Sequence, residues 1–150
     1  MHLIVFLLQA VWQAEPHHQQ WCVRRRFYFH PSPNWSLTVV TIAGFTYDRM
    51  LHTMPDDAWD IIMKVHVRAP FRLIRAAAPF MRIKAESGMP PENRSIINVS
   101  SVSGLHGNIG QANYAAAKSA IVGFTKTIAQ EWGAFGVRAN TIAFGYILTR

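Results

Sequence analysis

Residues 98–118 read NVSSVSGLHGNIGQANYAAAK, and this stretch joins two different kinds of predicted secondary structure. It begins inside the apolar segment 96–99, whose length and β-branched content predict a buried strand. A loop follows that contains Gly104, Gly107 and Gly110. The alanine-rich run 112–132 then predicts a long helix, which ends at a glycine. A strand, a loop and a long helix in this order are typical of an α/β protein.

The segments on either side repeat this alternation of strand and helix. Short apolar runs rich in β-branched residues predict two more strands, residues 37–42 and 137–143. Two helical patterns lie between the first two strands, at residues 53–67 and 70–84. The first begins with Thr53 as an expected capping hydroxyl, followed by a proline and two acidic residues. The pattern predicts an α/β fold with a parallel sheet and flanking helices.

The first 37 residues form an atypical prefix, followed by a second unit at residues 38–150. The prefix has no sustained period of 2 or 3.6, although it holds three of the five Trp and four of the seven His residues. Its prolines predict at most a short apolar helix or strand followed by irregular chain. Metal binding by His17, His18 and Cys22 is the less favoured interpretation, because no matching second set of ligands follows, so we expect no metal site.

Composition narrows the class of protein. The 150 residues, half of them hydrophobic, are enough for one domain with a buried core. The net charge of +7 includes only one basic run, residues 24–26, and this does not make a nucleic-acid site. The apolar run 3–12 is too short to span a bilayer, so no membrane contact is expected. A cytoplasmic location is favoured, while mitochondrial import and secretion stay open.

A possible proton-transfer group lies in the predicted long helix. Tyr114 and Lys118 are four residues apart, which puts both side chains on one helix face with Cβ atoms about 5–6 Å apart. Lowering a phenol pKa from about 10 by three units takes about 4 kcal/mol, and a neighbouring ammonium acts in that direction. Ser101, where the strand ends, is expected to hydrogen-bond the oxygen of a carbonyl substrate. Each of these residues alone has an ordinary structural interpretation, and the spacing by itself is weak evidence.

Taken together, residues 98–104 and 107–118 resemble the active-site block of the short-chain dehydrogenase/reductase family, closest to its 3-oxoacyl-carrier-protein reductase branch. The resemblance implies a partial Rossmann-like fold and an NAD(P)-dependent oxidoreductase that acts on a small ketone or secondary alcohol. It implies that Ser101 orients the carbonyl, that Tyr114 donates or accepts the proton, and that Lys118 lowers the tyrosine pKa and holds the nicotinamide ribose. The cofactor is NAD or NADP, and the branch slightly favours NADP.

Two further segments resemble cofactor-binding parts of the family. Residues 140–149 are similar to its later block and imply that Gly145, Ile147 and Thr149 contact the cofactor. Phe144 replaces the usual proline there, which predicts a less rigid loop. Residues 41–44 match the family's Asn-Asn-Ala-Gly segment only at Ala43 and Gly44, which are the cofactor contacts implied on this side.

His66 stands where the family has its catalytic asparagine. Two interpretations stay open from the sequence. In one the imidazole takes part in the proton relay, and in the other it only packs, because either tautomer satisfies a polar cleft.

The family's first, nucleotide-binding half is expected to be missing from this chain. A pyrophosphate site of that kind needs a glycine-rich turn, and no glycine precedes Gly44. We therefore expect a chain truncated at both ends, with little or no activity alone. The alternative function is an inactive module that interacts with full-length relatives. The two long helices are the expected surface for that contact and for a homo-oligomer.

Overall fold

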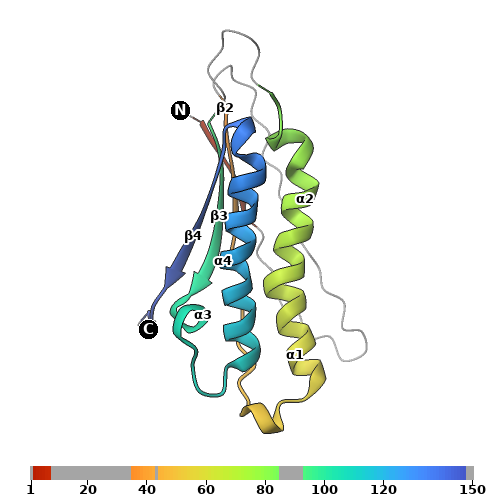
Figure 1. Ribbon diagram of the computed structural model, residues 1–150, viewed down its shortest axis with the longest axis vertical. Helices are drawn as coiled ribbons and strands as arrows, with labels where there is room; N and C mark the ends of the chain where they lie inside the picture. Colours follow the sequence, from red (N-terminus) through yellow and green to blue (C-terminus); the bar gives the residue numbers. More distant parts are fainter. Residues whose placement is uncertain (1, 8–34, 43, 85–92, 148–150) are drawn as a thin grey trace.

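The computed structural model describes residues 2–7, 35–42, 44–84 and 93–147. Four parallel strands form one sheet in the order β1-β2-β3-β4. The strands are β1 (His2–Leu7), β2 (Trp35–Thr41), β3 (Arg94–Ser101) and β4 (Val137–Phe144). Helices α2 and α4 run side by side along the sheet (Figure 1). The α/β class with a parallel, Rossmann-like sheet and flanking helices is confirmed.

Strand β1 lies in the prefix, where at most a short apolar helix or strand was expected. It pairs with β2 from His2 opposite Trp35 to Leu7 opposite Val40. Strand β2 begins at Trp35, so it crosses the boundary expected after residue 37. His17, His18 and Cys22 lie outside the described residues.

The two helices expected before β3 form one continuous helical stretch. Helix α1 (Asp56–Met63) passes through a π-helical turn, η2 (Lys64–Arg68), directly into α2 (Ala69–Met81). The turn precedes Pro70, which has no N–H for the carbonyl of His66 and whose ring crowds it. A wider π turn accommodates this crowding, so the proline does not end the helix.

The start of α1 differs from the expectation that Thr53 caps it. Thr53 ends a single 3-10 turn, η1 (Leu51–Thr53), and its hydroxyl donates to the Met50 carbonyl instead. The N-cap of α1 is Pro55, which offers no side-chain hydrogen bond. The Ala58 N–H donates both to the Asp57 carboxylate at 2.8 Å and to the Pro55 carbonyl at 3.1 Å, so a first-turn carboxylate adds to the backbone bond there.

Two of the three glycines between β3 and α4 lie in a loop, and the third lies in a helix. Gly104 belongs to the short helix α3 (Val102–His106), whose N-cap is Ser101, the acceptor of the Ser103 N–H. Gly107 and Gly110 have φ angles of 78° and 77°, which L side chains rarely adopt. Helix α4 (Ala112–Trp132) then spans the residues predicted for it.

The core lies between the sheet and the α2/α4 pair. One buried cluster joins Val39, Ile96 and Val137 of the sheet to two residues of each long helix, Ile74, Met81, Ile128 and Trp132. A buried polar chain lies beside it, in which Thr41 donates to the Asn98 Oδ1 at 2.7 Å and the Asn98 amide donates to Thr125 at 2.8 Å. These bonds tie β2, β3 and α4 together. Within the described parts of the chain, no helix is both long and apolar enough to cross a membrane.

Candidate active site

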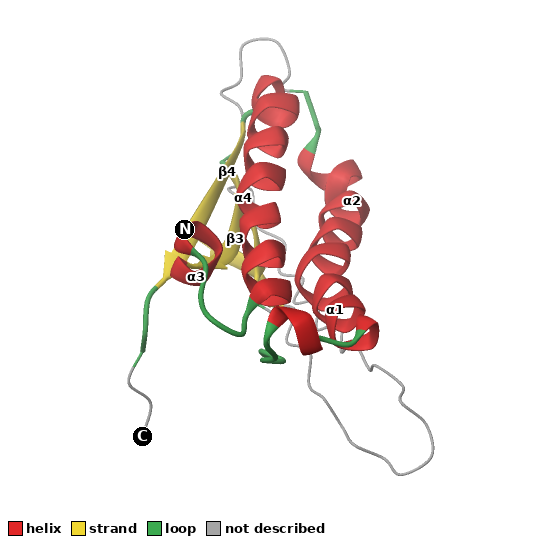
Figure 2. Cartoon of the chain, turned by 60° about the horizontal axis from the view of Figure 1, so that its bottom comes forward, coloured by secondary structure: helices red, strands yellow, loops and turns green. Residues whose placement is uncertain are grey.

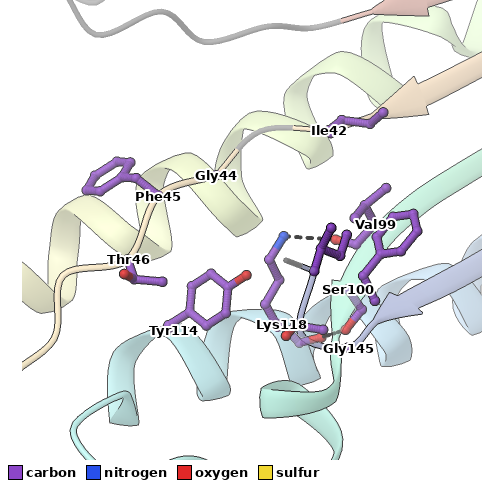
Figure 3. Close-up of a pocket in the computed structure, with 12 residues that line it drawn as sticks. Ile42, Gly44, Phe45, Thr46, Val99, Ser100, Tyr114, Lys118 and Gly145 are labelled. Atoms are coloured by element: carbon purple, nitrogen blue, oxygen red, sulfur yellow. Dashed lines mark hydrogen bonds between the residues drawn. The ribbon is translucent and has the colours of Figure 1, made fainter. Parts of the chain in front are cut away.

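A cavity of about 340 Å³ opens at the carboxyl ends of β2, β3 and β4 (Figure 3). This edge is where open parallel sheets bind ligands. The lining residues are Ile42, Gly44, Phe45, Thr46, Val99, Ser100, Ser101, Tyr114, Lys118, Phe144, Gly145 and Ile147. Six of the residues expected from the sequence are among them. Ala43 and Thr149 lie outside the described residues, and His66 does not line the cavity.

Ser101 and Tyr114 meet at the floor of this cavity. Ser101 is the last residue of β3, and Tyr114 lies in the first turn of α4. The Ser101 hydroxyl acts to lower the pKa of Tyr114. The Ser101 Oγ also accepts from the Ser103 N–H at 3.2 Å. The start of α3 therefore orients the hydroxyl that faces the tyrosine.

Lys118 is held by the end of β3 through both its side chain and its backbone. Its ammonium donates to the Val99 carbonyl at 2.9 Å, as Figure 3 shows, and lies 5.6 Å from the centroid of the Tyr114 ring. The Ser100 hydroxyl donates to the Lys118 carbonyl at 2.7 Å. Burial lowers the pKa of Lys118 to about 8. A lysine with this pKa is still mostly charged at neutral pH.

The pKa of Tyr114 is raised, whereas the resemblance implied a pKa lowered by Lys118. Burial of the half-buried phenol is the largest cause, the Ser101 hydroxyl opposes it, and the charge of Asp48 adds to the rise. The Lys118 ammonium contacts the ring face, while desolvation acts on the hydroxyl. Tyr114 is therefore a protonated donor in this structure.

His66 lies behind the cavity wall, in the π-helical turn, and is almost fully buried. Its Nε2 is 2.9 Å from the Phe45 carbonyl oxygen, and its ring packs edge-on against Tyr114 with centroids 5.1 Å apart. Its Nδ1 is buried without a hydrogen-bond partner among the described residues. An unpaired buried acceptor costs about 1–3 kcal/mol. Burial and the charge of Lys118 lower the pKa of His66 to about 4, and the hydrogen bond that His66 donates to the Phe45 carbonyl opposes this shift.

The pKa of His66 predicts acid-sensitive folding. The pKa of His66 is about 4 in the folded chain and 6.5 for an ordinary histidine. Between these pH values the unfolded chain therefore binds a proton that the folded chain does not. At 1.36 kcal/mol per unit, about 3 kcal/mol of stability is present above pH 6.5 and is lost as the pH falls to about 4. Urea unfolding at about pH 7 and about pH 4.5 measures this loss. In His66→Asn that part of the acid dependence should disappear. An unchanged dependence would contradict the assignment.

Asn113 is a supporting residue that the sequence did not single out. It is fully buried, its amide donates to the Tyr47 carbonyl at 3.1 Å and to the Ala58 carbonyl at 3.0 Å, and its Oδ1 accepts from the Tyr114 N–H. It joins the start of α4 to α1 and to the segment after β2. The only sequence signal was an amide directly before the tyrosine, and its partners are main-chain groups that a sequence does not reveal.

Known proteins resemble this chain in both structure and sequence. A crystal structure of a short chain dehydrogenase from Mycobacterium avium superposes with a TM-score of 0.64 at 38% identity, over 71% of this chain and 37% of that one. A hydroxyacyl-CoA dehydrogenase of Mycobacterium tuberculosis is 46% identical over 69% of this chain. A 3-oxoacyl-[acyl-carrier-protein] reductase of Vibrio cholerae is 43% identical over 74%.

These matches span only part of each relative. The chain covers 33% of the Mycobacterium tuberculosis protein and 43% of the Vibrio cholerae protein. The family profile described as short chain dehydrogenase matches residues 37–150, which is most of this chain. The chain belongs to the short-chain dehydrogenase family.

Proposed function

We propose that this site interconverts a ketone and a secondary alcohol by hydride transfer with an NAD(P) cofactor. The observation that carries the proposal is the convergence of Ser101, Tyr114 and Lys118 in one cavity. The favoured substrate is a 3-oxoacyl or 3-hydroxyacyl thioester, because similar proteins are named as 3-oxoacyl reductases and hydroxyacyl-CoA dehydrogenases.

The cavity residues fit the nicotinamide end of such a cofactor. The volume of about 340 Å³ lies in the range of small-molecule sites. Gly44 and Gly145 add backbone without side chains to the lining, and the Lys118 ammonium has three donors, one of which bonds Val99. When bound, the cofactor supplies or takes up the hydride. NADP is slightly favoured by the resemblance, and the two forms are compared in the assay below.

The chain's own groups would manage the proton. As the carbonyl carbon of the substrate gains the hydride, negative charge grows on the carbonyl oxygen. The Tyr114 hydroxyl would donate its proton to this oxygen. The Ser101 hydroxyl donates a hydrogen bond to the same oxygen. The positive charge of Lys118 stabilises the phenolate that remains on Tyr114. Alcohol oxidation uses the same groups in reverse.

The direct test is an assay of reduced cofactor consumption with acetoacetyl-CoA, run with NADH and with NADPH over a series of cofactor concentrations. The sequence left open little or no activity, and the presence of Ser101, Tyr114 and Lys118 in one cavity favours little activity over none. We therefore expect slow turnover with a high KM for cofactor, because residues 1–43 hold no glycine for a phosphate-binding turn. Lys118→Ala should abolish turnover, while Lys126→Ala, on the same helix, should not. No consumption at any cofactor concentration would contradict the proposed function.

A second candidate function is pairing with full-length relatives through α2 and α4, which lie side by side (Figure 2). Phe71 of α2 is 41% exposed, its ring is 6.3 Å from that of Phe124 on α4, and the Arg75 guanidinium lies 4.9 Å from it. An exposed aromatic ring that packs on a partly buried ring of the neighbouring helix favours a protein contact. Mixing with a full-length relative should give co-elution that Phe71→Glu removes. Separate elution of the wild-type chains would discard this candidate.

A further inference from the structure

His66 contacts both walls of the cavity from behind. The loop after β2 supplies one wall, and its Phe45 carbonyl accepts from the His66 ring at 2.9 Å. Helix α4 supplies the other wall, and its Tyr114 ring meets the imidazole at an interplanar angle of 86°. His66 comes from neither segment, since it lies in the π-helical turn between α1 and α2. The imidazole therefore lies between the two walls of the cavity and contacts both.

Gly44 lies directly against the His66 ring. A Cβ atom at position 44 would lie 2.6 Å from the His66 Cε1 and 3.4 Å from its Nδ1. Real Cβ atoms do not approach other atoms to 2.6 Å, so the imidazole occupies the space that any side chain at position 44 would need. Gly44 lines the cavity, so a shift of the ring would move the cavity wall.

The hydrogen bond to Phe45 decides the protonation of the ring. A carbonyl oxygen only accepts, so Nε2 must carry the hydrogen and Nδ1 is a bare acceptor in the neutral ring. Burial and the Lys118 ammonium both disfavour an imidazolium here. The neutral ring leaves Lys118 as the cation that faces Tyr114.

We propose that His66 is a positioning residue for the reaction proposed above, holding the Gly44 and Phe45 wall against the Tyr114 ring as a neutral imidazole. This inference rests on the proposed function. Its two contacts need different properties of the side chain: the N–H binds Phe45, and the flat ring packs against Tyr114. Asparagine keeps an N–H donor without the ring, and phenylalanine keeps the ring without the donor.

Steady-state kinetics on four variants of the full chain separate these properties. His66→Asn and His66→Phe should each lower kcat about tenfold with little change in substrate KM, because the first loses the ring contact with Tyr114 and the second loses the hydrogen bond that holds the Phe45 wall. Gly44→Ala should lower kcat by a similar factor through the clash with the ring. Combined with His66→Asn, it should cause no further loss, because the smaller amide frees space for the methyl group.

Two outcomes of these kinetics would overturn the inference. One is a double variant whose loss is the product of the two single losses, since the clash would then not run through the ring. The other is a set of variants with lowered Tm but wild-type kcat per folded molecule, which would leave His66 only a packing role. A wild-type chain without turnover would instead count against the proposed function.

A second measurement needs no activity. In the ¹⁵N spectrum of histidine-labelled protein, the resonances lost in His66→Asn identify this ring. They should report a neutral ring with hydrogen on Nε2, unchanged as the pH falls from about 8 to about 5. Titration with a midpoint near that of a free histidine, or hydrogen on Nδ1, would overturn the inference whether or not turnover is found.

Discussion

Tyr114→Phe is expected to lower kcat/KM for acetoacetyl-CoA reduction by about 10³-fold, in the range of general acid catalysis. The variant loses the hydroxyl that would protonate the substrate oxygen. The ring stays, and with it the contacts to His66 and to the Lys118 ammonium, so the variant should fold normally. Steady-state rates together with circular dichroism check both parts of the expectation.

Tyr146→Phe is the matched control for this change. Tyr146 follows β4 and is 88% exposed, so the same hydroxyl is removed near the mouth of the site without loss of a buried contact. Its rate should stay within about twofold of wild type. If Tyr114→Phe kept more than about a tenth of the wild-type rate, the proton donor would have to be another group.

The second large effect is expected at Gly104→Ala, which should lower the free energy of unfolding by about 3 kcal/mol. A Cβ atom at position 104 would lie 2.7 Å from the Lys118 carbonyl carbon and Cβ, and 2.8 Å from the Ser119 nitrogen. These are mainly backbone atoms of α4, so no side-chain rotation relieves the clash. Helix α3 must therefore move away from the part of α4 that holds Lys118. Urea unfolding measures the loss.

Gly123→Ala tests whether the effect at Gly104 is steric. Gly123 lies within α4, and a Cβ atom there would meet nothing within 4 Å. Alanine is the better helix former, so this variant should gain about 1 kcal/mol. Equal losses at both positions would mean that glycine matters for a reason other than the close contact of α3 with α4.

Local sequence patterns predicted the helices and strands whose formation depends mainly on neighbouring residues. The alanine-rich run of α4 and the β-branched runs of β2, β3 and β4 show their character within a few residues, and the structure has them within a few residues of the expected bounds. The expected break before Pro70 was wrong, because a π turn absorbs the proline. Gly104 was wrongly placed in a loop, because its packing against α4 is a tertiary contact.

The candidate site also has features that the sequence predicts and features that it does not. Tyr114 and Lys118 share a helix face through their spacing, and Ser101 ends the neighbouring strand, so their approach followed from local rules. The backbone contacts that hold the side chains of the site in place could not be predicted from the sequence. The Val99 carbonyl that binds Lys118 and the Phe45 carbonyl that binds His66 are backbone groups from distant segments, and backbone groups carry no sequence signal.

Isotope transfer tests the central claim most directly. The chain is incubated with acetoacetyl-CoA and a reduced cofactor that carries deuterium at the transferable nicotinamide position, and the hydroxyacyl product is analysed by mass spectrometry. The account predicts one deuterium on the new carbinol carbon and none detectable from Tyr114→Phe. Product without deuterium, or equal labelled product from both chains, would contradict a hydride transfer assisted by Ser101, Tyr114 and Lys118.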